Sequence, residues 1–388
     1  MKRTAGNRAR DIFDTYTRDV SPEDLQRLFT YDARDAYRFF ARGLDEDQFA
    51  GLPWWRRVPL RVRQIFIAFT LKLPPARRVL YMAALLIALV GIIRLFRGFS
   101  AVEVPFGVPF IQVALLLPVW ADGTLALILS LFLVNLLVLL EVADRLSLKG
   151  ELEVAREIQL AMLPRGTYTV GDVEICGVTR PANTVGGDFY DVLPLPDGRI
   201  IVTLGDVTGK GSPAALLMAL LLAVLRTLVD EALEAPALMR RLNAQICRHS
   251  PSSRFITLFY AVYTPSSGAL TYVNAGQTPP LVRRRDARFE RLGGTGVALG
   301  MFEGSEFGSV DTTLEPGEML VMYSDGITEA EDPQGRPFDE PGLERVVEQF
   351  ADASASDIDA HVLEAVETHA NDSRFTDDLT ILILKRRA

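Results

Sequence analysis

The sequence predicts an α/β protein: a helical, partly membrane-embedded N-terminal part followed by a C-terminal domain built on two packed β-sheets. Two observations carry this prediction. First, 49% of the 388 residues are apolar and the mean hydropathy is +0.18, which is high for a protein that lies wholly in water. Second, long uncharged runs within residues 79–140 give way after residue 166 to short β-rich runs separated by turns, with helical patterns between them.

Residues 1–78 are predicted to form a cytoplasmic helical and interfacial segment. Residues 21–24 read Ser-Pro-Glu-Asp, which is typical of a capped helix start. Residues 52–78 combine two tryptophans and seven basic residues with an apolar face, as in helices that lie on a bilayer. That face consists of Val62, Ile65, Phe66 and Phe69. A basic, aromatic nucleic-acid arm is the alternative, but we expect the membrane and no nucleic acid as the partner, because an apolar region follows directly.

Residues 79–140 are predicted to be a membrane region with spans at about 79–96 and 124–140. Each run is apolar all round and about long enough to cross a bilayer, whereas soluble helices are rarely apolar on every face. A buried soluble helix is the alternative for each. Residues 104–120 are also apolar but contain three prolines, which favours a re-entrant or interfacial hairpin over a third span.

The charge distribution around the first span predicts the topology. Residues 1–78 carry 16 Lys and Arg against 10 Asp and Glu, whereas Arg94 and Arg97 are the basic residues near the loop after the first span. The positive-inside rule therefore puts the N-terminus in the cytoplasm, and two spans return the chain there. We expect a multi-pass protein of the cytoplasmic (inner) membrane whose C-terminal domain is cytoplasmic.

Residues 141–165 are predicted to be a linker helix that continues from the second span. A stripe of side chains recurs at alternating spacings of four and three, which is the pattern of a coiled coil. The stripe consists of Leu148, Leu152, Ala155, Gln159 and Met162. It is short, and Gly150 weakens the helix. Two interpretations follow: a linker helix lying on its own C-terminal domain, or a homodimerising lever that passes signals to it.

Residues 166–388 show the strand and helix patterns of one domain. Strands are expected at 173–179, 199–204, 255–263, 269–274, 319–322 and 381–384, and helices at 213–228, 236–248, 342–350 and 356–369.

Four acidic turns within this domain stand beside predicted strands. Their aspartates are Asp188, Asp206, Asp325 and Asp377. Glycine neighbours three of them and lets the backbone come close to a ligand. Hard divalent cations prefer oxygen ligands, and two such ions activate a water for in-line attack on a phosphoryl group. Taken singly, each aspartate is more often a turn former, but several such aspartates with a backbone carbonyl could together hold a pair of ions.

Six motifs, in order, make the C-terminal part similar to the SpoIIE-type branch of the PPM serine/threonine phosphatases, relatives of protein phosphatase 2C. They are ARxIQ…MLP from residue 155, GGDFYD from 186, GDVTGKG from 205, NAGQTPP from 274, LEPGEMLVMYSDGITEA from 314 and DDLT from 377. This resemblance implies an α-β-β-α sandwich, the PPM phosphatase fold. It also implies two Mn²⁺ or Mg²⁺ ions, with Asp188, Asp206, the Val207 carbonyl, Asp325 and Asp377 as ligands.

The function that the resemblance implies is hydrolysis of phosphoserine or phosphothreonine on a regulatory protein by a water bridging the two metals. An anti-sigma-factor antagonist or a similar phosphorylated regulator is the expected substrate. The alternative is a catalytically silent scaffold that only binds phosphoprotein. Retention of all four aspartates favours the enzyme.

Several residues near the motifs depart from the family pattern or have a second interpretation. Gln277 stands where many relatives have histidine, and Thr208 stands where eukaryotic relatives have a histidine general acid, so water would have to protonate the leaving group. Asp191 and Asp378 are interpreted as solvent-facing, with binding of an outer water or a third ion as the alternative. Lys210 is interpreted as solvated, with contact to substrate phosphate as the alternative. Cys176 and Cys247 are expected to be reduced core thiols.

Overall fold

The computed structural model describes residues 54–96, 99–105, 112–118, 120–164, 166–251, 253–371 and 375–388. The helices predicted within residues 11–50 lie outside the described residues. The chain divides into two compact units, one ending at Arg145 and the other beginning at Leu146.

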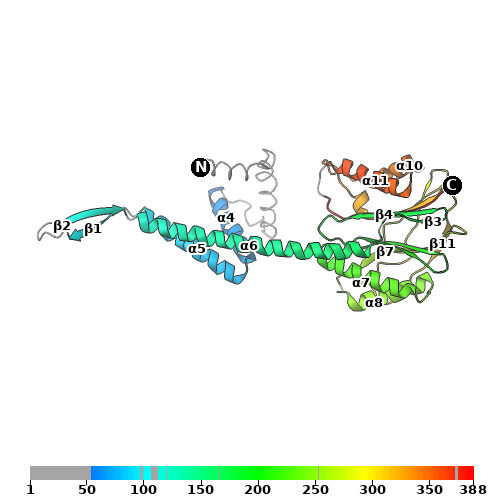
Figure 1. Ribbon diagram of the computed structural model, residues 1–388, viewed down its shortest axis with the longest axis horizontal. Coiled ribbons are helices and arrows are strands. Elements are labelled where there is room, and N and C mark those ends of the chain that lie inside the picture. Colours follow the sequence, from blue (N-terminus) through cyan, green and yellow to red (C-terminus); the bar gives the residue numbers. More distant parts are fainter. Residues whose placement is uncertain are drawn as a thin grey trace, which may run out of the picture. The chain divides into compact units, whose positions relative to one another are not determined.

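The described part of the first unit opens with two helices, α4 (Trp54–Lys72) and α5 (Pro75–Leu95) (Figure 1). Proline occupies the first turn of α5, where its missing N–H costs nothing. Arg78 joins the two helices because its guanidinium donates to carbonyls at the end of α4, which have no partner within that helix. The acceptors are the carbonyls of Thr70, Leu71 and Leu73, at 3.0, 3.0 and 3.2 Å.

An antiparallel β-hairpin connects α5 to α6 (Trp120–Met162). Its strands are β1 (Phe99–Pro105) and β2 (Gln112–Pro118), with Phe99 opposite Pro118. The hairpin predicted over residues 104–120 is therefore built of β-strands and begins earlier than expected. Two of its prolines end the strands, where a missing backbone donor disrupts the ladder least.

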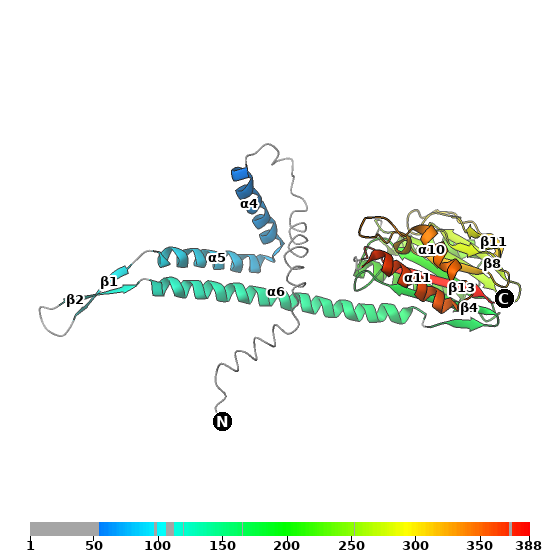
Figure 2. The same ribbon diagram turned by 90° about the horizontal axis from the view of Figure 1, so that it is seen from above.

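Helices α5 and α6 pack tightly and run side by side (Figures 1 and 2). Ser130 Oγ in α6 donates to the Ala84 carbonyl of α5 at 2.8 Å. A Cβ added at Gly123 would lie 2.9 Å from the Gly91 carbonyl oxygen, so only glycine allows this approach. Small residues at a helix contact are typical of helix pairs in membranes.

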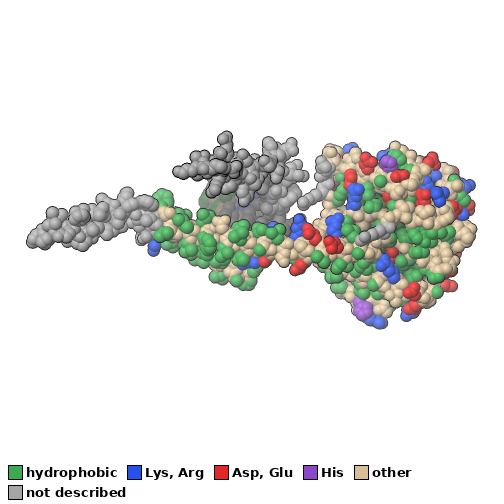
Figure 3. All heavy atoms as spheres, viewed as in Figure 1, with side chains coloured by type: hydrophobic (Ala, Val, Ile, Leu, Met, Phe, Trp, Pro, Cys, Tyr) green, Lys and Arg blue, Asp and Glu red, His purple; other side chains and the backbone are tan. Residues whose placement is uncertain are grey.

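The apolar side chains of this helix pair face outward, as Figure 3 shows. Those that are at least half exposed include Val79, Leu86, Leu89, Ile93, Leu125, Leu131, Phe132 and Leu139. By length and composition, three helices of the described chain are apolar enough to cross a membrane: α5, α6 and α7 (Ser212–Val229). Helix α7, however, belongs to the globular unit, where it packs on a sheet.

Within the described residues, the second unit contains two antiparallel sheets. The five-stranded sheet has the order β11 (Val310–Thr313), β8 (Ala269–Ala275), β7 (Ile256–Thr264), β6 (Ile200–Val207) and β5 (Phe189–Pro194). The six-stranded sheet has the order β10 (Phe289–Arg291), β9 (Leu281–Arg283), β12 (Met319–Tyr323), β13 (Leu379–Arg386), β4 (Val173–Arg180) and β3 (Tyr168–Val170).

Helices cover the outer face of each sheet (Figure 1). Helices α7 and α8 (Ala235–His249) pack on the five-stranded sheet. Helix α11 (Ala355–Ala370) packs on strands β4 and β13 of the six-stranded sheet, with α10 (Asp339–Gln349) beside it. The predicted α-β-β-α sandwich is therefore confirmed.

Strand β13 shows why its sequence reads as a continuous apolar run. Leu382 and Leu384 face the core between the sheets, whereas Ile381 and Ile383 face the core under α10 and α11. Since both faces of the strand are covered, alternation with polar residues is lost.

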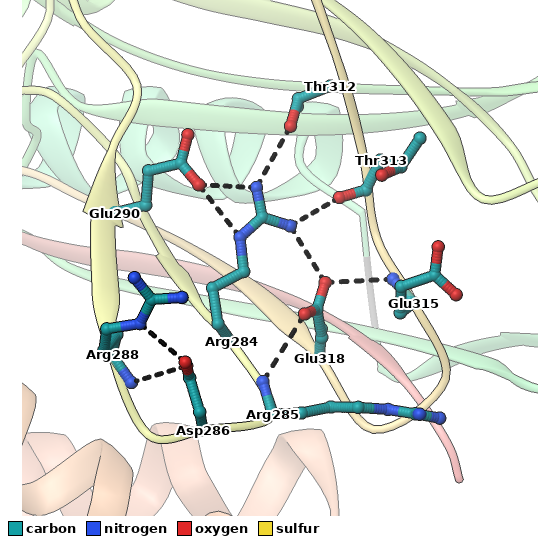
Figure 4. Close-up of polar contacts among 9 residues, drawn as sticks. All are labelled: Arg284, Arg285, Asp286, Arg288, Glu290, Thr312, Thr313, Glu315 and Glu318. Carbon is teal, nitrogen blue, oxygen red and sulfur yellow. Dashed lines mark hydrogen bonds and ion pairs between the residues drawn. The ribbon is translucent and has the colours of Figure 1, made fainter.

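The β9–β10 hairpin is held by a network around Arg284 (Figure 4). The guanidinium pairs with Glu290 and with Glu318, whose Oε2 lies 2.9 Å from Nη1. It also donates to the Thr313 carbonyl at 2.6 Å. These residues line a polar hollow in which three carboxylates balance three arginines. The carboxylates belong to Asp286, Glu290 and Glu318, and the arginines are Arg284, Arg285 and Arg288. The hollow therefore carries little net charge, and its ion pairs stabilise the hairpin.

Candidate metal centre

The turn that carries Asp188 lies directly before β5 and is buried. Asp188 is 3% exposed, and its Oδ2 has no hydrogen-bond partner in the described part of the chain. A buried carboxylate oxygen without a donor is costly unless another group completes it. The atom is thus free to bind a ligand.

Asp206 and Val207 end β6 and lie against this turn. A Cβ added at Gly187 would stand 2.6 Å from the Val207 carbonyl oxygen and 2.7 Å from Asp206 Oδ1. No side chain fits there, which is the physical reason for glycine before Asp188. Three of the expected ligand groups therefore meet.

Asp325 and Asp377 come from neighbouring strands of the other sheet. Asp325 follows β12 and begins the short helix α9 (Asp325–Thr328), while Asp377 precedes β13, which pairs with β12. The two ends are tied together by Ser324, whose N–H donates to the Thr380 carbonyl at 2.9 Å. Gly326 is needed here as well, because a Cβ would clash with the Asp378 carbonyl.

Asp378 is buried, so the solvent-facing interpretation is wrong. It is 6% exposed, and its carboxylate accepts from the Ala182 N–H at 2.8 Å and the Gly187 N–H at 2.7 Å. Asp378 therefore holds the turn that carries Asp188. Its partners lie more than 190 residues away in the sequence, so no local pattern reveals this role.

The solvent-facing interpretation is wrong for Asp191 too, because this residue is 1% exposed. Its Oδ2 accepts from Arg226 Nε at 2.8 Å, and Arg226 Nη2 donates to the Met162 carbonyl at 2.6 Å. Asp191 thus links β5, α7 and the end of α6 and does not face the candidate centre.

The linker helix also touches the Asp188 turn, through Gln159. This side chain is 4% exposed, donates to the Gly186 carbonyl at 2.9 Å and accepts from the Gly186 N–H at 3.2 Å. Gln159 is a member of the side-chain stripe that the sequence predicts along this helix, and the other four members are apolar. A glutamine in such a stripe was the available signal of a polar partner.

The stripe itself lines an apolar groove against α7. All five of its members border this groove, together with Ala215, Leu216 and Ala219 of α7. The end of α6 therefore contacts the domain that follows it, through Gln159 and the Met162 carbonyl.

Two residues that depart from the family pattern have structural partners. Gln277 is buried, and its Oε1 accepts from Thr257 Oγ1 at 2.6 Å. Thr208 Oγ1 donates to the Phe255 carbonyl at 2.8 Å and accepts from the Phe255 N–H at 2.9 Å. Thr208 is consequently occupied by the backbone of the loop before β7.

Mutual repulsion and burial shape the charges of the acidic cluster. Burial, then the charges of Asp325 and Asp377, raise the pKa of Asp206 to about 6. Burial and the charge of Asp206 raise the pKa of Asp188 well above its usual range. Burial, then Asp377, raise the pKa of Asp325. The charges of the four aspartates therefore interact. A cation among them would lower the raised pKa values of Asp188, Asp206 and Asp325.

The donor set suits a hard divalent cation. It consists of carboxylate oxygens, one of them buried and unpartnered, and a backbone carbonyl. In the described part of the chain, no three His, Cys, Asp or Glu side chains are already arranged to hold an ion.

The fold and the sequence agree with those of known phosphatases. The chain superposes on the SiaA-PP2C domain of Pseudomonas aeruginosa with a TM-score of 0.54 and 19% identity, covering 63% of this chain and 98% of that one. Phosphoserine phosphatase RsbU of Bacillus subtilis is 28% identical over 62% of this chain and 71% of its own length. Protein IcfG of Synechocystis sp. is 30% identical over 65% of this chain, which spans 44% of IcfG.

These findings define a protein phosphatase domain of the protein phosphatase 2C class. More narrowly, residues 196–387 match the profile of the family Stage II sporulation protein E (SpoIIE), and the chain carries a domain of that family. The matched segment contains Asp206, Asp325 and Asp377, whereas Asp188 lies just before it.

Proposed function

We propose that this chain is a membrane-anchored, metal-dependent protein serine/threonine phosphatase. The observation that carries the proposal is the meeting of Asp188, Asp206, Asp325 and Asp377 between two sheets of a SpoIIE-family domain. The raised pKa values of Asp188, Asp206 and Asp325 support a need for cations at this point.

Asp188, Asp206, the Val207 carbonyl, Asp325 and Asp377 would hold two Mn²⁺ or Mg²⁺ ions. When bound, these ions supply Lewis acidity and an activated water for attack on phosphorus. Asp378 keeps the Asp188 turn in register. Thr208 uses its hydroxyl proton on a backbone carbonyl, so the leaving serine or threonine oxygen would take its proton from water.

The test is Mn²⁺-dependent hydrolysis of a phosphoserine peptide by the full chain and by Asp206→Asn and Asp325→Asn. Each substitution removes one charge from the centre and should lower activity by more than about 100-fold. Asp286→Asn, in the exposed β9–β10 turn, is the control and should retain activity. Undiminished activity in both centre variants would reject this centre.

The same assay separates the enzyme from a phosphoprotein-binding scaffold. A scaffold would bind the phosphopeptide without releasing phosphate at any Mn²⁺ concentration. We propose a phosphorylated regulator of the anti-sigma-factor-antagonist type as the natural substrate. The similarity to phosphoserine phosphatase RsbU supports that substrate class.

Helix α5 and the first half of α6 are proposed to be two membrane spans, with the phosphatase domain in the cytoplasm. Their outward-facing apolar side chains and close glycine contact support this arrangement. A reporter fused at Ala388 should behave as cytoplasmic in a topology assay. Periplasmic reporter activity would contradict the two-span arrangement.

A homodimer through the linker helix remains part of the proposal. Other apolar side chains of α6 lie outside the groove against α7 and are exposed, including Val154 at 57%. Val154→Glu should convert a dimer in detergent to a monomer, as measured by light scattering. A monomeric wild-type chain would exclude the dimer.

A further inference from the structure

Lys210 extends from the turn between β6 and α7 into the acidic cluster. Its Nζ contacts the Thr376 carbonyl and lies 3.0 Å from Asp377 Oδ2. Both side chains are about half exposed, at 50% and 46%. The solvated interpretation of Lys210 therefore misses an ion pair with an expected metal ligand.

Among the described residues, the Lys210–Asp377 ion pair is the only one between a basic side chain and any of the four aspartates. Its charge also acts on Asp325, whose pKa it lowers against the effects of burial and of Asp377. The lysine thus supplies positive charge where two aspartates would otherwise repel each other.

Both carboxylate oxygens of Asp377 are engaged. Oδ1 accepts from the Asp378 N–H at 3.0 Å, and Oδ2 accepts from Lys210. A divalent cation would need an oxygen of Asp377 in its inner coordination sphere. A divalent ion at Oδ2 would lie beside the Lys210 ammonium, 3.0 Å from this oxygen, and like charges repel, so the two cations compete for Oδ2.

The turn around Lys210 suits a side chain that moves. Gly209 and Gly211 flank it with φ of 95° and 78°, values that other residues adopt rarely. Lysine carries a compact charge on a flexible four-carbon stem, which can swing into solvent.

We propose that Lys210 is a built-in competitor for the cation at Asp377: its ammonium stands in for a metal in the empty enzyme and must leave Oδ2 before a divalent ion binds there. This inference rests on the proposed metal-dependent function and adds a residue that sets its metal affinity. It makes the enzyme sensitive to divalent-ion concentration, because the ion has to displace an internal charge.

The test is Mn²⁺ titration of the full chain in detergent by calorimetry, comparing wild type with Lys210→Met. Methionine keeps an unbranched side chain and removes the charge. Lys149→Met, an exposed lysine of α6 with only an i,i+4 partner at 4.0 Å, removes the same charge elsewhere. Lys210→Met should bind one Mn²⁺ on the order of tenfold more tightly at low ionic strength, and the gain should shrink in high salt. Lys149→Met should match wild type.

A second readout uses the metal-free protein. In EDTA, Lys210→Met should unfold at a lower temperature than wild type and Lys149→Met, because the aspartates lose their internal counter-charge. Equal or weaker Mn²⁺ binding by Lys210→Met beside a binding wild type would overturn the competitor role alone. Absence of Mn²⁺ binding in every variant would overturn the metal centre as well.

Discussion

Helices α5 and α7 have almost the same mean hydropathy, 2.1 and 2.0, yet the chain uses them in opposite ways. Of the 18-residue apolar segment in each helix, only 11% is buried within the protein for α5, against 44% for α7. In α7, Met218, Leu221 and Leu222 are fully buried against the five-stranded sheet. Apolar composition alone therefore does not distinguish a helix whose apolar side chains stay exposed from one that completes a core.

The largest expected difference between the two helices comes from matched leucine substitutions. Leu222→Ala in α7 leaves a cavity in a closed core and should destabilise the phosphatase domain by about 2–5 kcal/mol. Leu86→Ala in α5 removes a side chain that is 59% exposed and should change that domain's stability by less than about 0.5 kcal/mol. Thermal or urea unfolding in detergent measures both. Equal losses of stability in the two variants would contradict the difference between α7 and α5.

Glycine substitutions test the contact between α5 and α6, because the two backbones approach each other closely at Gly123. Gly123→Leu would drive its side chain into the backbone of α5 and should cost about 1–3 kcal/mol or separate the helices. Gly150→Leu, in the same helix but with no atom within 4 Å of the added Cβ, is the control and should be neutral or slightly stabilising. Protease protection of the two spans in lipid vesicles reports the difference. A protected Gly123→Leu variant would contradict the close contact.

The smallest expected effect concerns buried acids. In the first unit Glu141 pairs with Arg77 at 3.0 Å, whereas both oxygens of Asp359 in α11 are buried and have no partner in the described part of the chain. Burial raises the pKa of Asp359 well above its usual range. The folded state then holds the proton at pH values where the unfolded chain has released it. Stability should fall as pH rises from about 4 through the raised pKa.

Asp359→Asn should flatten this pH dependence without a matching change at pH 4. Unfolding midpoints from pH 4 to pH 9 measure it. A wild-type slope that persists in the variant would assign the effect to other groups.

The sequence predicted those features that depend on local pattern. Strand β13 was recognised because covered strands are apolar throughout, and the aspartates were placed at strand ends because turn glycines accompany them. Asp191 and Asp378 were misjudged, since each is buried by a partner far along the chain. Arg226 and the backbone of Ala182 carry no mark of these contacts in the sequence. The linker stripe left two interpretations open because only the fold shows that the stripe borders a groove against α7.

The domain boundaries illustrate the same limit. The predicted start of the phosphatase domain at residue 166 lies just before β3, but the compact unit begins at Leu146. The end of α6 belongs to this unit because Gln159 and its neighbours contact the Asp188 turn and α7. Helix periodicity shows a continuous helix and gives no sign of where its surroundings change.

The central claim is that four distant aspartates hold a pair of divalent ions at one end of the sandwich. Anomalous scattering at the manganese edge from crystals grown with Mn²⁺ tests it most directly. We expect two anomalous peaks, bounded by Asp188, Asp206, the Val207 carbonyl, Asp325 and Asp377. Peaks elsewhere, or none among these residues at saturating Mn²⁺, would contradict it.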